Sequence, residues 1–217
     1  MKTAIILGAT GLTGSILLDT LIENPAFQKI KLFSRHAVEK HSSKIEEHII
    51  DMFQLESYSD DFKADVVFCC IGTTKAKTPD KEVYKMIDYG IPVTAAKLAK
   101  KNGIKTFMVI SALGADANSS IFYNKTKGEM QRDVAQQGIE NTYILQPSLI
   151  YGDRKESRLG ENVAISLMKI FRFLIPKKYR MISAKTIAQA MVFLSQNNFS
   201  GKIIPSEEIK KIAKLSA

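Results

Sequence analysis

Short apolar runs alternate with longer amphipathic segments over the first two thirds of the chain. The runs are rich in Val, Ile, Leu and Phe, which is typical of buried strands, and the segments between most of them are long enough to form helices. Strands that alternate with helices predict a parallel sheet covered on both faces. The predicted strands span residues 3–7, 29–33, 47–50, 65–71, 104–110 and 141–146.

The segment between residues 80 and 102 contains two residues that interrupt a helix, Gly90 and Pro92. We therefore predict a short helix that ends near Met86, followed by a longer helix with Asp88 as its N-terminal cap. Pro92 would then lie in the first turn of the longer helix, where a missing N–H costs least.

The remaining pattern completes a single doubly wound α/β fold of the Rossmann type. We expect one domain over residues 1–217, with a dinucleotide-binding core at 1–151 and a basic C-terminal segment on the substrate side at 152–217. The other predicted elements are a helix from Gly11 to Asn24, a helix over 124–138, helices at about 160–175 and 184–196, a strand at 201–204 and a final helix from about 206.

The net charge of +9 is concentrated in the last third of the chain. Residues 152–217 carry 13 Lys and Arg against 5 Asp and Glu, whereas residues 1–151 carry 18 against 17. Such a surplus of positive charge suits an anionic substrate, a membrane surface or a nucleic acid. The alternative is that these lysines are simply solvated. Residues 166–176 form a basic amphipathic stretch that suits a membrane or nucleic-acid contact, although packing against the sheet is favoured. We do not expect a nucleic-acid partner.

The chain has no feature of a secreted or membrane-spanning protein. Cys69 and Cys70 are adjacent on a predicted strand, so their side chains point to opposite faces and do not favour a disulfide. The four apolar residues of the first strand are too few for a signal peptide. Lys169 and Arg172 break the best candidate for a membrane span, which needs roughly 20 apolar residues. We expect a cytoplasmic location.

Three glycines at a spacing of three residues connect the first predicted strand to the first predicted helix. In such a turn the first glycine permits the tight bend, the second allows close approach to a pyrophosphate and the third lets the helix pack on the strand. The helix N-terminus then faces the anion. We expect this segment, the glycine turn, to bind a dinucleotide through Gly8, Thr10, Gly11, Leu12, Thr13 and Gly14.

The end of the second strand indicates which dinucleotide is preferred. An acidic residue there would bind the ribose 2′-hydroxyl of NAD(H), whereas an arginine suits the 2′-phosphate of NADP(H). Here Arg35 and His36 follow the strand, with no Asp or Glu. The sequence therefore favours NADP(H) over NAD(H), and the alternative is a solvated arginine at a strand end.

A second group of candidate residues has the chemistry of carbonyl reduction. Tyr123 and Lys127 are four residues apart, so on a helix they share one face and the ammonium lowers the pKa of the phenol. Tyr123 would act as general acid or base, Lys127 would support it and reach the nicotinamide ribose, and Ser111 would hydrogen-bond the substrate carbonyl. The alternative is a capping serine with a surface Tyr–Lys pair. Tyr151 and Lys155 match the same spacing.

Together these motifs resemble those of the atypical short-chain dehydrogenases/reductases, in particular the Tat-interacting-protein oxidoreductase group close to the NmrA-like proteins. The resemblance covers nearly the whole chain and includes the glycine turn, residues 68–74, residues 111–127, and the segments 146–148 and 153–161. It implies that Asp51 and Met52 lie near the adenine and that Arg154 and Arg158 lie near the substrate opening, where ion pairs with Glu156 or Glu161 are the alternative. It further implies that the dinucleotide is lined by Cys70, Ile71, Gly72 and Thr73, and that the nicotinamide is faced by Pro147, Leu149 and Ile150.

The predicted function is therefore an NADP(H)-dependent reduction of a small carbonyl compound, without a metal. In the resemblance, Ser119 and Ser120 are further candidates for the catalytic serine. Some NmrA-like proteins bind the dinucleotide as a signal, so the second hypothesis is a redox-sensing protein that docks a protein partner through its basic C-terminal third.

Overall fold

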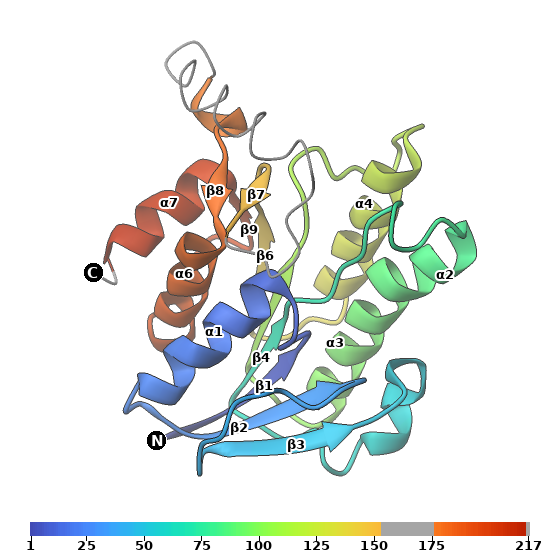
Figure 1. Ribbon diagram of the computed structural model, residues 1–217. Coiled ribbons are helices and arrows are strands. Elements are labelled where there is room, and N and C mark those ends of the chain that lie inside the picture. The colour runs from blue at the N-terminus through green and yellow to red at the C-terminus, as the bar shows by residue number, and fades with distance from the viewer. Residues whose placement is uncertain (153–175, 216–217) are drawn as a thin grey trace.

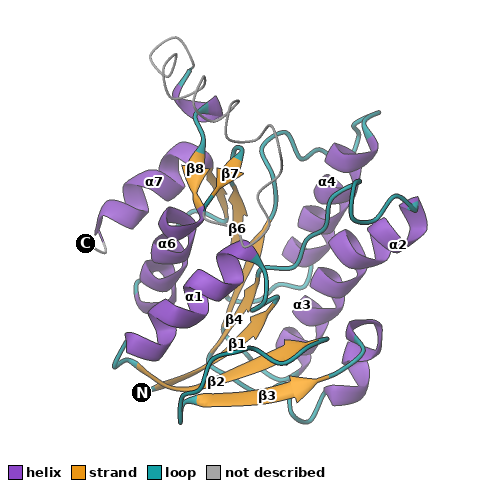
Figure 2. Cartoon of the chain, in the orientation of Figure 1, coloured by secondary structure: helices purple, strands orange, loops and turns teal. Residues whose placement is uncertain are grey.

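The computed structural model describes residues 1–152 and 176–215, and it contains a seven-stranded parallel sheet. The sheet order is β3-β2-β1-β4-β5-β6-β9, with every neighbouring pair parallel. A short parallel pair, β7 and β8, stands apart from it (Figure 2). The strands are β1 Lys2–Leu7, β2 Phe27–Ser34, β3 Ile45–Ile49, β4 Val66–Cys69, β5 Thr106–Ile110, β6 Asn141–Gln146, β7 Ile150–Tyr151, β8 Ile182–Ser183 and β9 Ile203–Pro205.

Helices cover both faces of the sheet, as the alternating pattern predicts. Figure 1 shows α1, α6 and α7 on one face and α2, α3 and α4 on the other. The α-helices are α1 Leu12–Glu23, α2 Lys81–Lys85, α3 Ile91–Lys101, α4 Phe122–Ala135, α6 Ala184–Gln196 and α7 Ser206–Leu215. The shorter helical turns are η1 Met52–Tyr58, η2 Met86–Gly90 and η3 Lys177–Tyr179.

Two hydrophobic clusters hold the layers together, one on each side of the sheet. Along β1, Ala4 and Ile6 belong to the cluster beneath α1, α6 and α7, while Ile5 and Leu7 belong to the cluster beneath α3 and α4. All four are fully buried. Alternate side chains of a strand point to opposite faces, so a central strand that is apolar at every position is buried on both sides. The doubly wound fold predicted from the sequence is confirmed.

The strand order reverses direction at the boundary between β1 and β4. From β1 the chain builds outward through β2 and β3, and it then returns to the other side of β1 to build β4, β5, β6 and β9. In open parallel sheets a ligand crevice forms beside this reversal, at the carboxyl ends of the strands. The glycine turn follows β1 and residues 70–73 follow β4, so both flank this crevice.

The prediction that Asp88 caps a separate helix is wrong. The chain runs from α2 through the π-helical turn η2 directly into α3, and Asp88 lies inside η2 with a buried side chain. Pro92 does lie in the first turn of α3. The helix predicted at about 160–175 lies outside the described residues.

Candidate functional site

The glycine turn has the tight geometry that its sequence predicts. Gly8 has a φ of 87°, in the left-handed region that favours glycine, and its carbonyl oxygen accepts a hydrogen bond of 3.0 Å from the N–H of Gly11. A Cβ atom at Gly14 would lie 2.1 Å from the oxygen of Gly8. The third glycine therefore allows α1 to pack directly on the turn.

The N-terminus of α1 is open to an anion. Gly11 is the N-terminal cap and supplies no side-chain hydrogen bond, and the first turn contains no acidic residue. The first N–H groups of the helix therefore need partners from outside, and the positive end of the helix dipole favours a negative charge there. Thr10 is exposed, Leu12 half-buried and Thr13 buried at this end. These features fit the pyrophosphate of a dinucleotide.

The loop after β4 lies against the glycine turn. A Cβ atom at Gly8 would be 3.0 Å from the carbonyl oxygen of Cys70 and 3.3 Å from Cδ1 of Ile71. Gly72 is exposed and Thr73 is half-buried. Burial raises the pKa of the Cys70 thiol, so this side chain is neutral and acts as an apolar neighbour of the turn. The structure thus brings Cys70 and Ile71 against the glycine turn.

The residues predicted near the adenosine follow β2 and β3. Arg35 is exposed directly after β2, and no acidic side chain stands at positions 34–38. Asp51 caps η1, because its Oδ1 accepts a hydrogen bond of 2.9 Å from the N–H of Phe53. Met52 is buried in the cluster beneath α3.

Lys127 lies on the second turn of α4, near the carboxyl end of β5. It is only 4% exposed, and its Nζ is 2.8 Å from Oδ1 of Asp88. The same ammonium is 3.5 Å from the carbonyl oxygen of Ile110 at the end of β5. A Cβ atom at Gly72 would lie 3.9 Å from it, so Lys127 sits beneath the loop after β4.

Tyr123 lies one turn before Lys127 on α4 and is 41% exposed. Burial raises the pKa of its phenol, the charge of Lys127 lowers that pKa and the charge of Asp88 raises it, with a net increase. The phenol is therefore protonated at neutral pH. Burial, with smaller contributions from Asp88 and Tyr123, also raises the pKa of the neighbouring Tyr84.

Ser111 follows β5, and its side chain contacts α4 two turns after Tyr123. Its Oγ is buried and accepts a hydrogen bond of 2.5 Å from Nε2 of Gln131, whose Oε1 accepts one of 3.1 Å from Gln146. Gln131 follows Tyr123 by eight residues, or about 12 Å along a helix axis. No hydrogen bond of the described residues joins Ser111 to Tyr123. Ser119 accepts a hydrogen bond from the N–H of Ile121.

The residues predicted to face the nicotinamide follow β6. Pro147 is buried and its carbonyl oxygen accepts a hydrogen bond of 2.9 Å from the N–H of Leu113, which ties this segment to the loop after β5. Leu149 is exposed, and Ile150 begins β7 and pairs with Ile182. The candidates Arg154 and Arg158, like residues 166–175, lie outside the described residues.

Sequence reasoning missed two side chains that contact the candidate residues, Asp88 and Gln131. Asp88 had a detectable signal, because Tyr84, Asp88, Ile91 and Ala95 repeat on one helical face and three of the four are apolar. A lone acid on such a face indicates a buried charge with a partner. Gln131 had no comparable signal, since its contacts come from β5 and β6.

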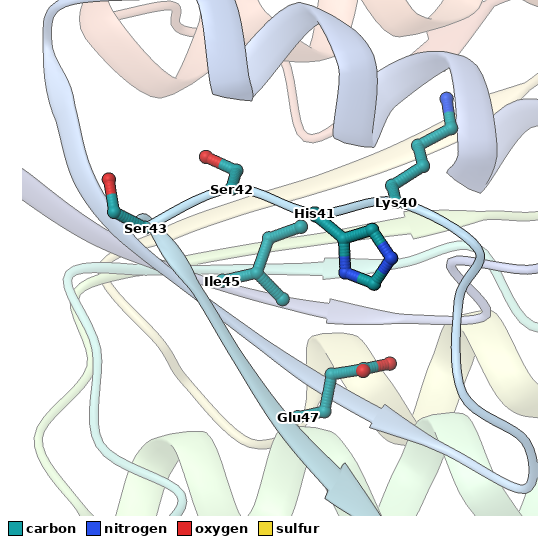
Figure 3. A pocket seen from close by; sticks show the side chains of 6 residues that line it. All are labelled: Lys40, His41, Ser42, Ser43, Ile45 and Glu47. Atoms are coloured by element: carbon teal, nitrogen blue, oxygen red, sulfur yellow. The ribbon is translucent and has the colours of Figure 1, made fainter.

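A hollow on the loop between β2 and β3 lies away from this crevice. Figure 3 shows its lining side chains, which are Lys40, His41, Ser42, Ser43, Ile45 and Glu47. The backbone oxygen of Lys44 accepts a hydrogen bond from Ile30 near the amino end of β2. The hollow therefore lies toward the end of the sheet opposite the glycine turn.

None of the helices that the structure describes is long and apolar enough to cross a membrane. Within residues 1–152 and 176–215, no group of three His, Cys, Asp or Glu side chains has the arrangement of a metal site.

Comparison with known proteins shows clear relatives. A family model described as "Semialdehyde dehydrogenase, NAD binding domain" matches residues 3–93. The protein FMP52 of Candida albicans is 38% identical over 165 residues, which are 73% of this chain and 72% of that protein. FMP52 of Eremothecium gossypii is 30% identical over 220 residues and 97% of each chain. The protein HTATIP2 of Rattus norvegicus is 34% identical over 167 residues, which are 75% of this chain and 69% of that protein.

Solved structures with the same fold are more distant in sequence. UDP-glucose 4-epimerase of Thermotoga maritima superposes with a TM-score of 0.71 at 14% identity, covering 98% of this chain and 82% of that one. The Bordetella bronchiseptica enzyme WbmH, solved in complex with NAD+, gives a TM-score of 0.72 at 16% identity, covering 99% and 80%. At these identities the likeness concerns the fold alone.

The expected cytoplasmic location is contradicted by the relatives. The FMP52 proteins of Candida albicans, Eremothecium gossypii and other fungi are named as mitochondrial proteins. The adjacent cysteines Cys69 and Cys70 and the apolar pattern, from which the location was inferred, are compatible with any reducing compartment and do not distinguish between organelles.

Proposed function

The chain belongs to the family of FMP52 and HTATIP2, NmrA-like atypical short-chain dehydrogenases/reductases with an NAD(P)-binding fold, and we propose that it is an NADP(H)-dependent reductase of a small carbonyl compound. The observation that carries the proposal is the position of Lys127. Its ammonium is buried between the ends of β4 and β5, one helical turn from Tyr123 and beneath the loop that borders the glycine turn.

The dinucleotide would bind along the carboxyl ends of the strands. In this proposal the glycine turn and the open N-terminus of α1 hold the pyrophosphate, and residues 70–73 line the dinucleotide. Asp51 and Met52 border the adenine. Pro147, Leu149 and Ile150 border the nicotinamide.

The preference for NADP(H) rests on Arg35. Arg35 is exposed directly after β2, where the 2′-phosphate of NADP(H) would lie, and residues 34–38 contain no acidic side chain. A guanidinium binds a phosphate through two parallel charge-assisted hydrogen bonds, which favours the phosphorylated dinucleotide.

Tyr123 would supply the proton. When bound, NADPH supplies the hydride that reduces the carbonyl carbon. The phenol of Tyr123 is protonated at neutral pH because burial raises its pKa, so it can give a proton to the carbonyl oxygen. Lys127 then stabilises the phenolate that remains. Ser111 is the proposed hydrogen-bond donor to the carbonyl of the substrate, and its Oγ accepts a hydrogen bond from Gln131.

Replacement of Tyr123 by Phe tests the proposal. Loss of the proton donor should lower kcat for NADPH-dependent carbonyl reduction by about 100-fold or more, while the affinity for NADPH changes little. Tyr58→Phe is the matched control, because Tyr58 lies at the end of η1, packs against the cluster beneath α3 and α4, and should leave kcat unchanged. Full turnover by Tyr123→Phe would exclude the proposed role.

A redox-sensing protein is the second candidate. It would bind the dinucleotide without turning over any carbonyl compound, and its affinity for a protein partner would change between NADPH and NADP+. The observation that favours it is that Ser111 hydrogen-bonds to Gln131, two turns along α4 from Tyr123, and not to Tyr123 itself. Tight NADPH binding with no turnover across a panel of aldehydes and ketones would favour this function.

A further inference from the structure

Asp88 links α4 to the loop after β4 through one buried carboxylate. The residue is 1% exposed. Its Oδ1 is 2.8 Å from Nζ of Lys127 on α4, and its Oδ2 accepts a hydrogen bond of 2.7 Å from the N–H of Thr73 in the loop after β4. A Cβ atom at Gly72 would lie 3.7 Å from Oδ1. The carboxylate therefore lies directly beneath the loop that borders the glycine turn.

The π-helical turn η2 explains how Asp88 reaches this position. In a regular α-helix the ring of Pro92 would clash with the carbonyl oxygen of Asp88, four residues earlier. The chain widens here, because the N–H of Ile91 donates to the oxygen of Met86 five residues before it. Such widened turns inside helices are frequent at functional sites. Asp88 lies inside this widened turn, where it contacts α4 and the loop after β4.

A buried ion pair is weak evidence for stability. Two charges lose their hydration when they are buried, and apolar residues of similar volume often stabilise a protein as much or more. The contacts of Asp88 point to another role, because both of its partners border the proposed dinucleotide site. We propose that Asp88 is a positioning residue, which fixes Lys127 and the loop at Thr73 with one carboxylate and partly offsets the charge of Lys127 beside Tyr123.

The proposal rests on the proposed function, because it concerns the direction in which Tyr123 acts. An unpaired ammonium four residues from Tyr123 would favour the phenolate and hence a base. Paired with Asp88, the ammonium has less effect, and the phenol keeps the proton that a reductase must give. The other titratable groups that face the pair are Tyr84 of α2 and Cys69 of β4, and burial keeps both neutral by raising their pKa.

Asp88→Asn removes the charge with almost no change of shape. We would label the tyrosines with 13C at Cζ, assign Tyr123 by its loss in Tyr123→Phe, and follow its ionisation by NMR without dinucleotide. The midpoint of Tyr123 should fall by about one pH unit in Asp88→Asn. Asp133→Asn is the matched control, since Asp133 is also on α4 but pairs with Arg132 and Tyr89. An unchanged midpoint in Asp88→Asn, or an equal fall in Asp133→Asn, would overturn the proposal.

A second measurement needs no variant, in case Asp88→Asn does not fold. The amides of Thr73 and Asn118 both lie in loops and both donate to an aspartate, Thr73 to the buried Asp88 and Asn118 to the exposed Asp116. If Asp88 anchors its loop, the Thr73 amide should exchange with solvent on the order of 100-fold more slowly than that of Asn118. Equal exchange rates would refute the anchoring.

Both measurements are made without cofactor or carbonyl substrate. A protein that shows the Tyr123 shift but no turnover would keep the role of Asp88 and refute the reductase. A protein that reduces carbonyl compounds but shows no shift would keep the reductase and refute the role of Asp88.

Discussion

The substitution Gly14→Ala tests whether the packing of α1 on the glycine turn makes the dinucleotide site. The added Cβ would lie 2.1 Å from the oxygen of Gly8 and 2.8 Å from its carbonyl carbon, and neither atom belongs to a flexible side chain. An ordinary contact begins near 3.4 Å, so the helix and the turn must separate by about 1.3 Å. Tightly packed interiors resist such a change.

The cost can be expressed in two measurable quantities. Inserting a methyl group into a packed site destabilises a protein by about 1–3 kcal/mol. For a chain of this size that corresponds to a fall in Tm of about 2–12 °C. The N–H groups at the start of α1 move together with the helix, and each charge-assisted hydrogen bond that is lost costs about 1.5–3 kcal/mol, so NADPH affinity should fall at least about 10-fold.

Thermal unfolding and NADPH fluorescence measure the two effects on the same samples. Gly90→Ala is the control, because a Cβ atom there meets no atom within 4 Å and the backbone is helical. It should leave affinity unchanged and keep or raise Tm, since alanine is favoured over glycine in helices by about 0.5–1 kcal/mol. A Gly14→Ala protein with the Tm and affinity of the unmodified chain would refute the packing argument.

Two further substitutions test the electrostatics. Arg35→Asp should lower NADPH affinity by about 10–100-fold and leave NADH binding equal or tighter, because the exposed cation proposed to bind the 2′-phosphate becomes an anion. An unchanged ratio of the two affinities would refute the role of Arg35. The Lys29 ammonium, 2.8 Å away, together with smaller contributions from His48 and Lys31, lowers the pKa of Glu46 from 4.5 to about 2. Glu46→Gln should therefore lower Tm at pH 7. The difference in Tm between the variant and the unmodified chain should disappear as the pH falls from 4.5 towards 2, where the unmodified carboxylate loses its charge. A difference in Tm that does not vary with pH would contradict the ion pair.

The sequence predicts the sheet and the glycine turn well because their signals are local. Apolar runs and the spacing of Gly8, Gly11 and Gly14 can each be recognised within a few residues of sequence, and the observed strands agree with the predicted ones within two residues at each end. The short pair of β7 and β8 escaped prediction, since two-residue strands leave no periodic pattern.

Asp88 shows why the chemistry of the site is harder to predict. An acid near the start of a predicted helix, followed by a proline, has the local pattern of an N-terminal cap. The tertiary structure gives it different partners, Lys127 and Thr73, at distances of 39 and 15 residues along the chain. The hydrogen bond between Ser111 and Gln131 is equally non-local. Partners of this kind depend on how helices dock on the sheet, which periodicity does not encode.

The proposed function requires that the carboxyl ends of the strands bind NADP(H) and support carbonyl reduction. The most direct test is a fluorescence titration of the purified protein with NADPH and with NADH, followed in the same cuvette by a panel of aldehydes and ketones at fixed NADPH. The account predicts tighter binding of NADPH than of NADH, and oxidation of NADPH that depends on a carbonyl compound. Failure to bind either dinucleotide would contradict it.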